Sequence, residues 1–580
     1  MKARHQRELA QDTLSREVGY VRKAHANRLR IALIFPNTYF VGMSNLGFQT
    51  IYRLFNDHPE IVCERAFLPP KQELAALRDA GTRIVTLESQ TPVRDFDVIA
   101  FSVSFEWDYT NVLTMLRLAD VPVRAADRDH THPLVVIGGA VTFVNPEPLA
   151  PFADVIAAGE GEALVPALVD AFGTSSRRGQ LQRLAETRGY YIPSFYDVEY
   201  ATDGTIARYV PREGSGAPPV VRKAALKTTE AVDPPSTTIF TPDTEFGSRF
   251  LVEVVRGCAN LCRFCWAGYN YLPVRAFPTD RILALAQQAR AHSSRAGLVS
   301  IALCDHPDIE HILRSLKDMG YSISPASLRL DDLTPTIVSL LKESGERTLT
   351  IAPETGSDRL RRVINKTITN EEILEKAELI FSSGIESLKL YYMIGLPSED
   401  DADLVAIRDL TLQLHETMLK HARARGRIGR IVASVNPLVP KPGTAYQWLA
   451  MERADDIERK MKRLRTLVAG IDNVYFNIKS ERHSYYQALL SLGDRRIAPA
   501  IELAEANGGQ WRKAVADAGL DGDFYIYRDR TNDVVLPWNI IDGGMKEPFF
   551  RAEFDKSTRA EWTLPPKRAK ENARLLPVLN

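Results

Sequence analysis

Cysteine is scarce in this chain, with five residues among 580. That number is too small for a disulfide scaffold, and the sequence therefore predicts a protein of a reducing compartment. An excess of one charge is also lacking, because 73 Lys and Arg balance 73 Asp and Glu. A neutral chain has no overall attraction for nucleic acid or anionic membranes. No apolar run approaches the roughly 18 residues of a membrane span, and none follows the basic N-terminus as in a secretory signal. We therefore expect a cytoplasmic protein.

The bulk composition is that of a folded globular protein. Hydrophobic residues make up 45% of the chain and charged residues 25%, which excludes a disordered or collagen-like chain. At about 150 residues per domain, the length predicts three or four domains rather than a single core.

The first third of the chain alternates short apolar runs with helical patterns. Each run has the continuous hydrophobic character of a strand that is buried on both faces. The expected strands are residues 30–35, 98–103, 134–137 and 155–158, and the expected helices are residues 48–55, 111–118 and 163–172. This order predicts an open parallel α/β sheet of the Rossmann-like kind.

A second alternating series begins near residue 250. Its expected strands are residues 251–255, 299–303, 324–328, 348–351, 387–392 and 431–435, with helices such as 281–291 and 371–381 between them. Six such units predict a full or partial (β/α) barrel. Barrel chemistry lies at the carboxyl ends of the strands, so functional residues are expected there.

Between the two series, proline, glycine and serine interrupt the pattern and predict a linker or an irregular crossing segment. The last hundred residues are mixed α+β, with a helix expected at 500–506 and candidate strands near 524–527. The predicted organisation is an N-terminal extension (1–29), a Rossmann-like domain (30–205), a linker (206–245), a barrel (246–470) and a C-terminal region (471–580).

Three of the five cysteines fall within eight residues, directly after an expected strand: Cys258, Cys262 and Cys265. Thiolates are the ligands of iron–sulfur clusters, and three ligands on a four-iron cluster leave one iron open. A structural zinc site normally has a fourth ligand in a paired motif, and a disulfide conflicts with a reducing compartment. The spacing therefore favours an iron–sulfur centre over zinc.

The motif Cys-x-x-x-Cys-x-aromatic-Cys, with Phe264 before its last cysteine, resembles the signature of radical S-adenosylmethionine (SAM) enzymes. The resemblance implies a 4Fe–4S cluster whose open iron chelates SAM, and cleavage of SAM to a 5′-deoxyadenosyl radical. It also implies an electron donor such as a flavodoxin or a ferredoxin.

The resemblance further implies SAM contacts at the strand ends of the barrel. The usual Gly-Gly-Glu segment after the second strand is absent, and Asp305 is expected to accept from the SAM ammonium in its place. The predicted SAM-binding residues are Phe264, Asp305, Ser327, Arg329, Glu354 and Gly356.

Paired glycines end two strands of the first domain, at Gly138-Gly139 and at Gly159-Glu160-Gly161. Glycines at this edge of a parallel sheet let the backbone approach a ligand closely. Tight turns between strand and helix explain them equally well, so the spacing alone leaves both interpretations open.

The order of these segments, from residue 31 to Glu162, resembles the cobalamin-binding domain that precedes many radical SAM cores. The resemblance implies cobalamin contacts from Gly138, Gly139, Gly159, Glu160 and Gly161. It extends to about residue 545, in a family of cobalamin-binding-domain radical SAM proteins.

The Asp-x-His motif that supplies a cobalt ligand in cobalamin mutases is absent from this chain. The resemblance therefore implies cobalamin without a histidine ligand, or a domain that has lost cobalamin. The lower cobalt face would then meet the loop after the first strand, Asn37–Phe40, or another loop that the sequence does not identify.

The leading hypothesis is a radical SAM enzyme that uses cobalamin to methylate an unactivated carbon. A radical rearrangement, cyclisation or oxidation without methyl transfer is the first alternative. RNA methylthiolation is a second, although it resembles enzymes with another three-cysteine cluster, and only Cys63 and Cys304 remain outside the motif. A cobalamin sensor with a structural cluster is a third, but an open iron favours catalysis.

The basic run at residues 420–430 suggests contact with RNA phosphates, but a solvated helix end explains it better. The substrate, small or macromolecular, is not identifiable from the sequence.

Overall fold

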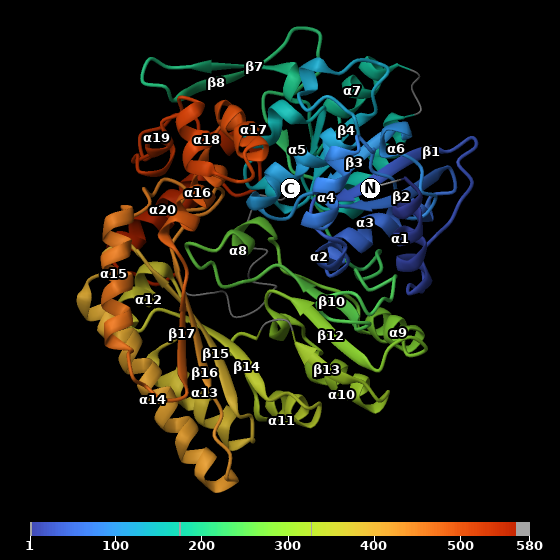
Figure 1. Ribbon diagram of the computed structural model, residues 1–580. Helices are drawn as coiled ribbons and strands as arrows, with labels where there is room; N and C mark the ends of the chain where they lie inside the picture. The colour runs from blue at the N-terminus through green and yellow to red at the C-terminus, as the bar shows by residue number, and fades with distance from the viewer. Residues whose placement is uncertain (1–2, 173–175, 326–327, 564–580) are drawn as a thin grey trace.

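The structure is a computed structural model that describes residues 3–172, 176–325 and 328–563. Figure 1 shows an N-terminal α/β domain in blue above a central half-open barrel in green to orange, with C-terminal helices in orange and red beside both. The C-terminal helices therefore cover parts of two regions that precede them in the chain.

The N-terminal domain is built on a six-stranded sheet in the order β2-β1-β3-β4-β5-β6. The first five strands are parallel, and β6 is antiparallel to β5. The strands are β1 (Leu29–Phe35), β2 (Ile61–Phe67), β3 (Val98–Ser102), β4 (Leu134–Gly138), β5 (Val155–Ala157) and β6 (Tyr190–Tyr191). The parallel α/β sheet predicted from the apolar runs is confirmed. In a sheet of order 2-1-3-4-5, the chain reverses its winding direction at β1 and β3, where such folds bind ligands.

Both faces of this sheet are covered by helices, which explains the continuous apolar runs. Ile31, Leu33 and Phe35 of β1 pack on one side in a core that includes residues of α3 (Leu46–Asp57) and α6 (Gly161–Ala171). Ala32 and Ile34 face the opposite core, which contains residues of α5 (Tyr109–Leu118). The second core continues into the C-terminal helices, so the sheet and those helices share buried apolar surface.

The central region is an open, partial barrel made of two sheets, β11-β10-β12-β13 and β14-β15-β16-β17. All neighbouring strands are parallel except the short β11. The strands are β10 (Phe250–Arg256), β11 (Arg275–Ala276), β12 (Arg295–Ser300), β13 (Ser322–Pro325), β14 (Thr348–Glu354), β15 (Ser387–Ile394), β16 (Ile431–Pro437) and β17 (Val474–Ile478). In the described part of the chain, no ladder joins β13 to β14, and Figure 1 shows the two sheets splayed apart there.

Helices cover the outside of the barrel, while polar residues of β15 face its open interior. The helices are α9 (Thr279–Ala289), α10 (Ile309–Asp318), α11 (Pro335–Glu343), α13 (Asn370–Ser382), α14 (Asp401–Arg425) and α15 (Ala454–Leu467). Lys389 and Tyr391 alternate with buried residues along β15 and are exposed. The inner face of the half-open barrel is therefore accessible from solvent.

The second barrel strand does not lie where the sequence predicts it. The expected strand at 299–303 is observed as β12, which begins at Arg295. The start of the strand was missed because Arg295 is polar and exposed. The end was placed too late because Leu303 is buried in a short 3₁₀ turn that follows the strand. The apolar run thus marks the interior and not the strand.

Strand β17 extends the barrel beyond its expected end at residue 470. After β17 the C-terminal region is mainly helical: α16 (Glu481–Leu492), α17 (Ala498–Ala506), α18 (Trp511–Asp517), α19 (Gly522–Ile526) and α20 (Glu547–Thr558). The candidate strands near 524–527 are wrong, because α19 occupies that stretch. Asp521 caps this helix by accepting a hydrogen bond from the Phe524 amide. Tyr525 and Ile526 of the same helix are buried. A local cap and burial on one side override the β propensity of these aromatic residues.

The expected linker at 206–245 is an irregular crossing segment packed on both flanking regions. Its first residues form β8 (Ile206–Pro211), which pairs with β7 (Tyr196–Tyr200) across the expected domain boundary. Farther along, β9 (Val221–Arg222) pairs with β18 (Ile541–Asp542) near the end of the described chain. The Gln49 side chain accepts from the amides of Thr238 and Ile239. The segment is therefore held in place at several points along its length.

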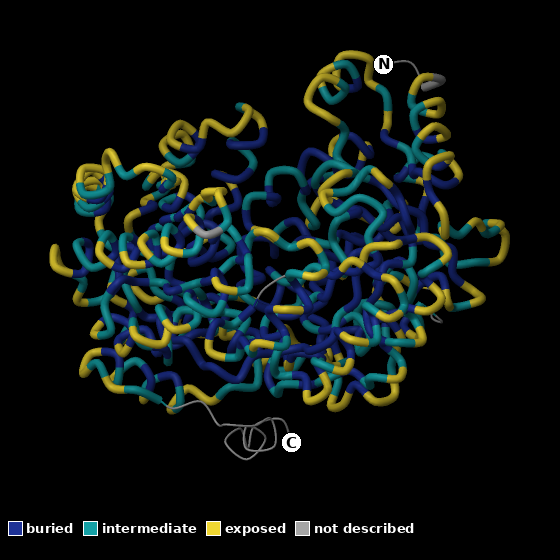
Figure 2. Tube along the Cα trace, turned by 90° about the horizontal axis from the view of Figure 1, so that it is seen from below, coloured by how far each residue is buried: buried dark blue, intermediate teal, exposed yellow. Residues whose placement is uncertain are grey.

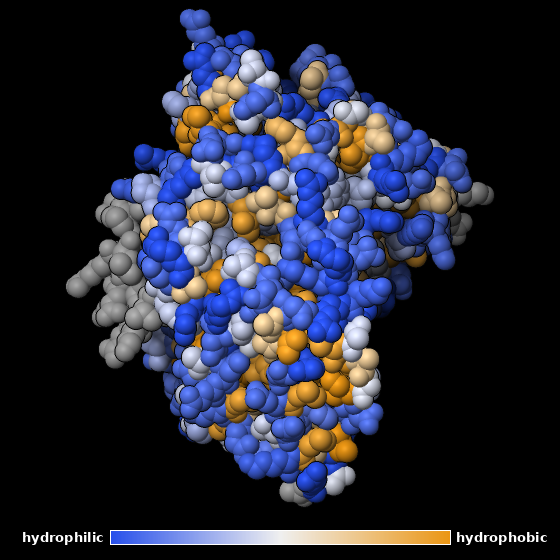
Figure 3. Space-filling view, turned by 90° about the vertical axis from the view of Figure 1, so that its left-hand side faces the viewer, coloured by the Kyte–Doolittle hydropathy of each residue, from blue (hydrophilic) through white to orange (hydrophobic). Residues whose placement is uncertain are grey.

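Buried residues run through the interior of all three regions, and exposed residues lie mainly on outer loops and helix faces (Figure 2). The face in Figure 3 is mostly hydrophilic, with hydrophobic side chains in separate areas. None of the described helices is both long enough and apolar enough to cross a membrane.

A buried ion pair joins the N-terminal domain to the C-terminal region. Glu147 is fully buried, and its carboxylate accepts from Arg495 Nε at 2.8 Å and from the Tyr191 hydroxyl at 2.7 Å. Removing one partner of a buried pair leaves the other charge unpaired, which is more costly than removing a surface pair.

We expect Glu147→Gln to lower the free energy of unfolding by about 3 kcal/mol, because Arg495 loses its carboxylate. Urea unfolding followed by tryptophan fluorescence measures the effect. The matched control is Glu199→Gln, which removes an exposed pair with Arg208 and should leave the transition midpoint almost unchanged. Equal shifts in both variants would contradict a structural role for the Glu147 pair.

Candidate functional site

The three motif cysteines lie on one loop between β10 and the short helix α8 (Trp266–Asn270). We call residues 257–265 the cysteine loop. Gly257 leaves β10 with a φ of +96°, and a Cβ there would lie 2.6 Å from the Tyr271 carbonyl oxygen. Only glycine fits this turn, which brings Cys258 and Cys262 into the interior and leaves Cys265 half-buried.

Arg263 anchors the cysteine loop from behind. Its fully buried guanidinium donates to the carbonyls of Arg362 and Val363, at 2.7 and 3.0 Å, and pairs with Glu553 of α20 at 3.2 Å. Asn365 also donates to the Leu261 carbonyl at 3.3 Å. The loop is thereby fixed to α12 (Asp358–Ile364) and to the C-terminal region.

The electrostatics of the loop suit a group that binds thiolates. All three cysteines are free thiols, and burial raises their pKa values above the ordinary value, to about 11 for Cys265. The positive charge of Arg329 near Cys258, and of Lys366 near Cys262 and Cys265, partly opposes this rise. A bound metal centre would supply the positive charge that buried thiolates need.

The described residues contain no group of three or more His, Cys, Asp or Glu side chains arranged to hold a single metal ion. The thiols of the cysteine loop nevertheless interact electrostatically with one another. Three neighbouring thiols can each supply one ligand to a multi-iron cluster.

Two predicted SAM-binding residues meet beside the first cysteine. Asp305 follows β12 and Arg329 follows β13, and their side chains form an ion pair at 3.2 Å. Arg329 also pairs with Asp332, whose pKa burial raises to about 6. Arg329 lies close enough to interact with the Cys258 thiol. The structure thus places a mixed-charge group next to the cysteine loop, whereas Ser327 lies outside the described residues.

Glu354 and Lys366 form a second charged pair, on the other side of the cysteine loop. Glu354 ends β14 with a φ of +65°, and its carboxylate lies 3.4 Å from Lys366 Nζ. Burial would lower the pKa of Lys366, but Glu354 and the Cys262 thiol raise it above its ordinary value. Lys366 therefore stays charged beside the thiols.

Gly356 and Phe264 have clear packing roles. A Cβ on Gly356 would lie 2.1 Å from the Ala406 carbonyl carbon, so this glycine allows close contact with α14. Phe264 packs on a small apolar cluster that contains Leu360 and Tyr446. Contact of either residue with SAM stays a prediction.

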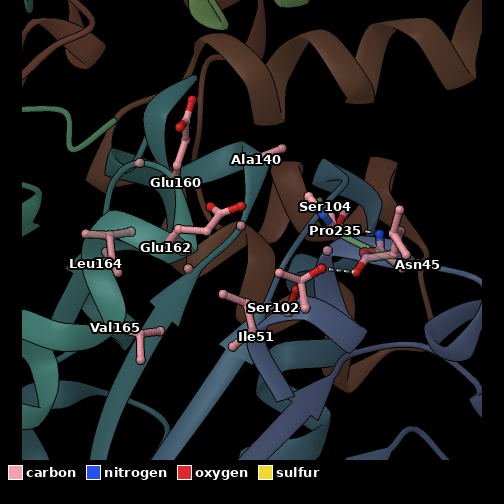
Figure 4. Close-up of a pocket in the computed structure, with 18 of the residues that line it drawn as sticks. Asn45, Ile51, Ser102, Ser104, Ala140, Glu160, Glu162, Leu164, Val165 and Pro235 are labelled. Carbon is pink, nitrogen blue, oxygen red and sulfur yellow. Dashed lines mark hydrogen bonds between the residues drawn. The ribbon is translucent and has the colours of Figure 1, made fainter. Parts of the chain in front are cut away.

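A cavity of about 540 Å³ lies at the carboxyl edge of the N-terminal sheet, where the winding reverses (Figure 4). Its inner wall is apolar and includes Leu33, Ala100, Val136, Ala157 and Val165. Its outer wall belongs to the barrel and includes Glu253, Arg256 and Val299–Ile301. One cavity is therefore lined by the N-terminal domain and by the barrel strand that leads into the cysteine loop.

The predicted glycines line this cavity, but their missing Cβ atoms give room to the chain itself. A Cβ on Gly139 would lie 2.4 Å from the Val103 carbonyl oxygen, and one on Gly159 would lie 2.1 Å from that of Ala224. A Cβ on Gly161 would meet the Ile51 side chain at 2.1 Å, whereas Gly138 has ordinary space. Close backbone packing thus explains Gly139 and Gly159, and ligand contact stays a prediction.

Glu160 is engaged by arginines and not by solvent. It pairs with Arg275 at 2.6 Å and with Arg256 at 3.1 Å. Burial alone would raise its pKa, but the two guanidinium groups hold that pKa below its ordinary value. Arg256 also pairs with Glu162 at 2.8 Å and with Glu253 at 2.7 Å. The predicted cobalamin contact of Glu160 would have to compete with these pairs.

Sequence reasoning missed Arg256, Arg275 and Glu253. Arg256 adjoins the cysteine loop in sequence, which was a usable signal. Arg275 comes from β11, beyond the loop, and nothing in its sequence context indicates a carboxylate partner more than a hundred residues earlier.

Asn37 is not among the residues that line the cavity. The side-chain amide nitrogen of Asn37 donates a hydrogen bond to Asp108 at 2.8 Å, and its side-chain oxygen accepts one from the Thr38 backbone amide. The segment after β1 instead reaches the cavity at Asn45, Leu46 and Gly47. The structure therefore does not bring Asn37 together with the other predicted cobalamin contacts.

The basic run at 420–430 is the end of α14 and the residues that follow it. Lys420 pairs with Glu378, Arg427 pairs with Glu386, and Arg425 donates to the Phe381 carbonyl. These contacts favour the interpretation of this run as a helix end.

Comparison with known proteins matches the two regions described above. Residues 47–193 match the model of the N-terminal domain of radical SAM proteins, and residues 252–411 match the radical SAM superfamily model. An uncharacterized protein of Methanocaldococcus jannaschii, MJ0966, is 27% identical over 483 residues, which cover 82% of this chain and 91% of that protein.

Two solved structures share low sequence identity with this chain. The radical SAM methyltransferase TsrM of Kitasatospora setae, solved with cobalamin and a [4Fe-4S] cluster, has a TM-score of 0.48 and 14% identity, covering 92% of this chain and 99% of TsrM. The cobalamin-dependent SAM radical enzyme OxsB, solved with aqua-cobalamin, has a TM-score of 0.44 and 14% identity. That alignment covers 70% of this chain but only 57% of OxsB.

The radical SAM match includes the whole cysteine loop and the strand ends that carry Asp305, Arg329 and Glu354. Such a domain implies a 4Fe–4S cluster and SAM, which is the pair of cofactors that the cysteine spacing predicts. On the two family models, which span both the cavity-bearing domain and the cysteine loop, the chain belongs to the radical SAM superfamily of enzymes.

Proposed function

We propose that the chain is a cobalamin-dependent radical SAM enzyme that methylates an unactivated carbon. The observation that carries the proposal is the cavity at the edge of the N-terminal sheet, which is closed on one side by the barrel strand that leads into the cysteine loop. A cofactor bound there would lie between the N-terminal domain and the chemistry of the barrel.

The cysteine loop is the proposed binding site of the 4Fe–4S cluster, through Cys258, Cys262 and Cys265. When bound, the cluster and SAM supply a 5′-deoxyadenosyl radical that removes a hydrogen atom from the substrate. In this proposal Asp305 accepts a hydrogen bond from the SAM ammonium, and its ion pair with Arg329 supports a charged, oriented carboxylate. Burial raises the pKa of Asp305, and Arg329 opposes the rise. Lys366 adds a positive charge near the thiolates.

The N-terminal cavity is the proposed cobalamin site. When bound, cobalamin supplies a cobalt centre that carries the methyl group. The apolar inner wall, between the sheet and helices α3 and α6, suits the base of a nucleotide tail. The lining residues include no histidine, so no imidazole of the described chain is available in the cavity to bind the cobalt.

A radical reaction without methyl transfer is the alternative. It needs the cysteine loop but not the N-terminal cavity. RNA methylthiolation remains disfavoured, because Cys63 is buried within β2 and Cys304 follows β12, so neither belongs to a second cysteine group in the described chain.

A triple variant should lose almost all iron when alanine replaces Cys258, Cys262 and Cys265 at the same time. Anaerobically reconstituted parent protein should hold about four irons per chain, because three thiolates bind a four-iron cluster. Iron analysis measures this, and circular dichroism checks that the variant is folded. The control Cys63→Ala should keep the parent iron content. Full iron retention in the folded triple variant would exclude the cysteine loop as the cluster site.

Filling the N-terminal cavity should prevent cobalamin binding and leave the iron unchanged. Val165→Phe adds a ring to the apolar wall, and we expect at least tenfold less retained cobalamin after incubation with hydroxocobalamin and removal of the excess. The control Val169→Phe is on the same helix and does not line the cavity. Retention equal to that of the parent protein would place cobalamin elsewhere, or show that the parent does not bind it.

The cobalt coordination gives a separate test. After reduction to cobalt(II), the paramagnetic resonance spectrum should lack nitrogen splitting from a lower ligand, because the cavity wall offers no histidine and the base of the nucleotide tail, held in the apolar wall, would not bind the cobalt. A spectrum with clear nitrogen splitting would contradict the proposed coordination.

Transfer of a methyl group can be tested without knowing the substrate. The reduced protein, loaded with both cofactors, is incubated with methyl-labelled SAM and an extract from cells that lack the protein. We expect label in a product that is one methylene heavier than its precursor, and none when the triple cysteine variant is used. Formation of 5′-deoxyadenosine with no labelled product would favour the radical-only alternative.

A further inference from the structure

A second cavity, of about 750 Å³, lies apart from the cysteine loop, where the N-terminal domain meets helices α16 and α18. We call it the aromatic pocket. Trp107 contributes from the loop that follows β3, and Ser480 begins α16 just after β17. Ser480 follows the carboxyl end of the barrel strand β17, so the pocket borders the mouth of the barrel on that side.

Four aromatic side chains form one side of the pocket. The Trp107 and His483 rings have centroids 4.4 Å apart and planes at 34° to each other. Trp511 meets Trp107 edge to face at 6.0 Å and stacks with Tyr486 at 6.0 Å. His483 is exposed and Trp107 is half-buried, whereas Trp511 and Tyr486 are buried. The aromatic surface that faces solvent is therefore that of His483 and Trp107.

Trp107 has an unused donor. Its indole Nε1–H is buried and has no hydrogen-bond partner among the described residues. Buried donors are normally paired, because an unpaired one loses the energy of its hydrogen bond to water.

The rest of the pocket is cationic. Arg482 and Arg512 are exposed, line the pocket and form no ion pair with any acidic side chain in the described residues. Lys513 also lines the pocket, but it pairs with Asp517 at 2.5 Å. Glu481 is the neighbouring acid on α16. The two unpaired arginines therefore leave net positive charge at the rim.

His483 belongs to the aromatic side of the pocket more than to its cationic side. Burial, together with the nearby charge of Lys479, lowers the pKa of His483 below its ordinary value. The ring is therefore mostly neutral near pH 7 and presents a π face like those of its neighbours.

We propose that the aromatic pocket binds a nucleotide unit, with the base stacked on the His483 and Trp107 surface and the phosphate held by Arg482 and Arg512. Single-strand-binding proteins combine these features, because aromatic faces stack on bases and cations neutralise phosphates. A purely apolar ligand would make no use of the two arginines. A simple anion would make no use of the aromatic surface.

The ligand is either a free nucleotide or one nucleotide of a single-stranded nucleic acid. The pocket is connected to the barrel through Glu106, which precedes Trp107 in the sequence. The Glu106 carboxylate accepts hydrogen bonds from Lys441, which follows β16, and from Ser491 of α16. A bound ligand would thus lie next to the barrel mouth. The inference does not depend on which reaction the barrel catalyses, and binding alone tests it.

The experiment measures binding to the full-length, iron-loaded protein under anaerobic conditions. The probes are 5′-AMP by calorimetry, and fluorescein-labelled oligo(A) RNA by anisotropy, as a single strand and as a duplex with oligo(U). The variants are His483→Ala, which removes a stacking face, and Arg482→Glu with Arg512→Glu, which reverses both charges. The control is Lys462→Glu with Arg465→Glu, an equal charge change on the exposed face of α15.

We expect each pocket variant to weaken binding at least tenfold, because one stacked base contributes roughly 1–3 kcal/mol. The charge reversal should also flatten the dependence of log Kd on log salt concentration. Binding of 5′-AMP identifies a free nucleotide as the ligand, and binding of the single strand alone identifies a nucleic acid.

Any one of the following outcomes would overturn the proposal. The first is that the parent protein binds neither probe, and the second is that the control variant loses as much affinity as the pocket variants. The third is that His483→Ala binds like the parent while only the charge reversal weakens binding. The last result would describe a general anionic contact without base stacking. Duplex binding as tight as single-strand binding would also exclude a stacked base.

Discussion

The guanidinium of Arg256 is the contact on which the arrangement of the site depends. This single buried group pairs with Glu253 of its own strand and with Glu160 and Glu162 of the N-terminal domain. Burial and the neighbouring carboxylates raise the pKa of Glu253, although Arg256 opposes this. Charges this well buried are stable only when they are paired. The geometry between the cavity wall and the start of the cysteine loop is therefore fixed by charge as well as by packing.

The C-terminal region gives the site its second support. Helix α20 reaches the cysteine loop through the Arg263–Glu553 pair, and Tyr269, which follows the loop, packs on Phe550 of the same helix. Helix α17 holds the opposite face of the N-terminal sheet, where Glu505 pairs with Arg78 and Arg117. The last hundred residues thus connect the two domains that carry the proposed cofactors.

Local pattern was enough to predict β1, β3, β4 and β5 of the N-terminal sheet and to single out the cysteine loop. Continuous apolar runs mark these four strands because helices cover both faces of the sheet, and three clustered thiols predict a metal site because few other structures need them. The pattern missed β2, because the buried Glu64 and Arg65 interrupt its apolar run. The pattern failed where distant residues decide. Gly159 is a glycine because Ala224 crosses it, and α19 is helical because a capping aspartate and a buried face outweigh aromatic β propensity. The partners of Arg275 and Trp107 likewise come from elements far away in sequence.

The position of α20 also constrains the order in which the protein is assembled. The cysteine loop leaves the ribosome long before the helix that anchors it, and β9 must wait equally long for β18. Until the final segments arrive, Arg263 has no carboxylate partner and the loop is held from one side only. Full anchoring of the cysteine loop therefore waits for α20, the helix farthest along the described part of the chain.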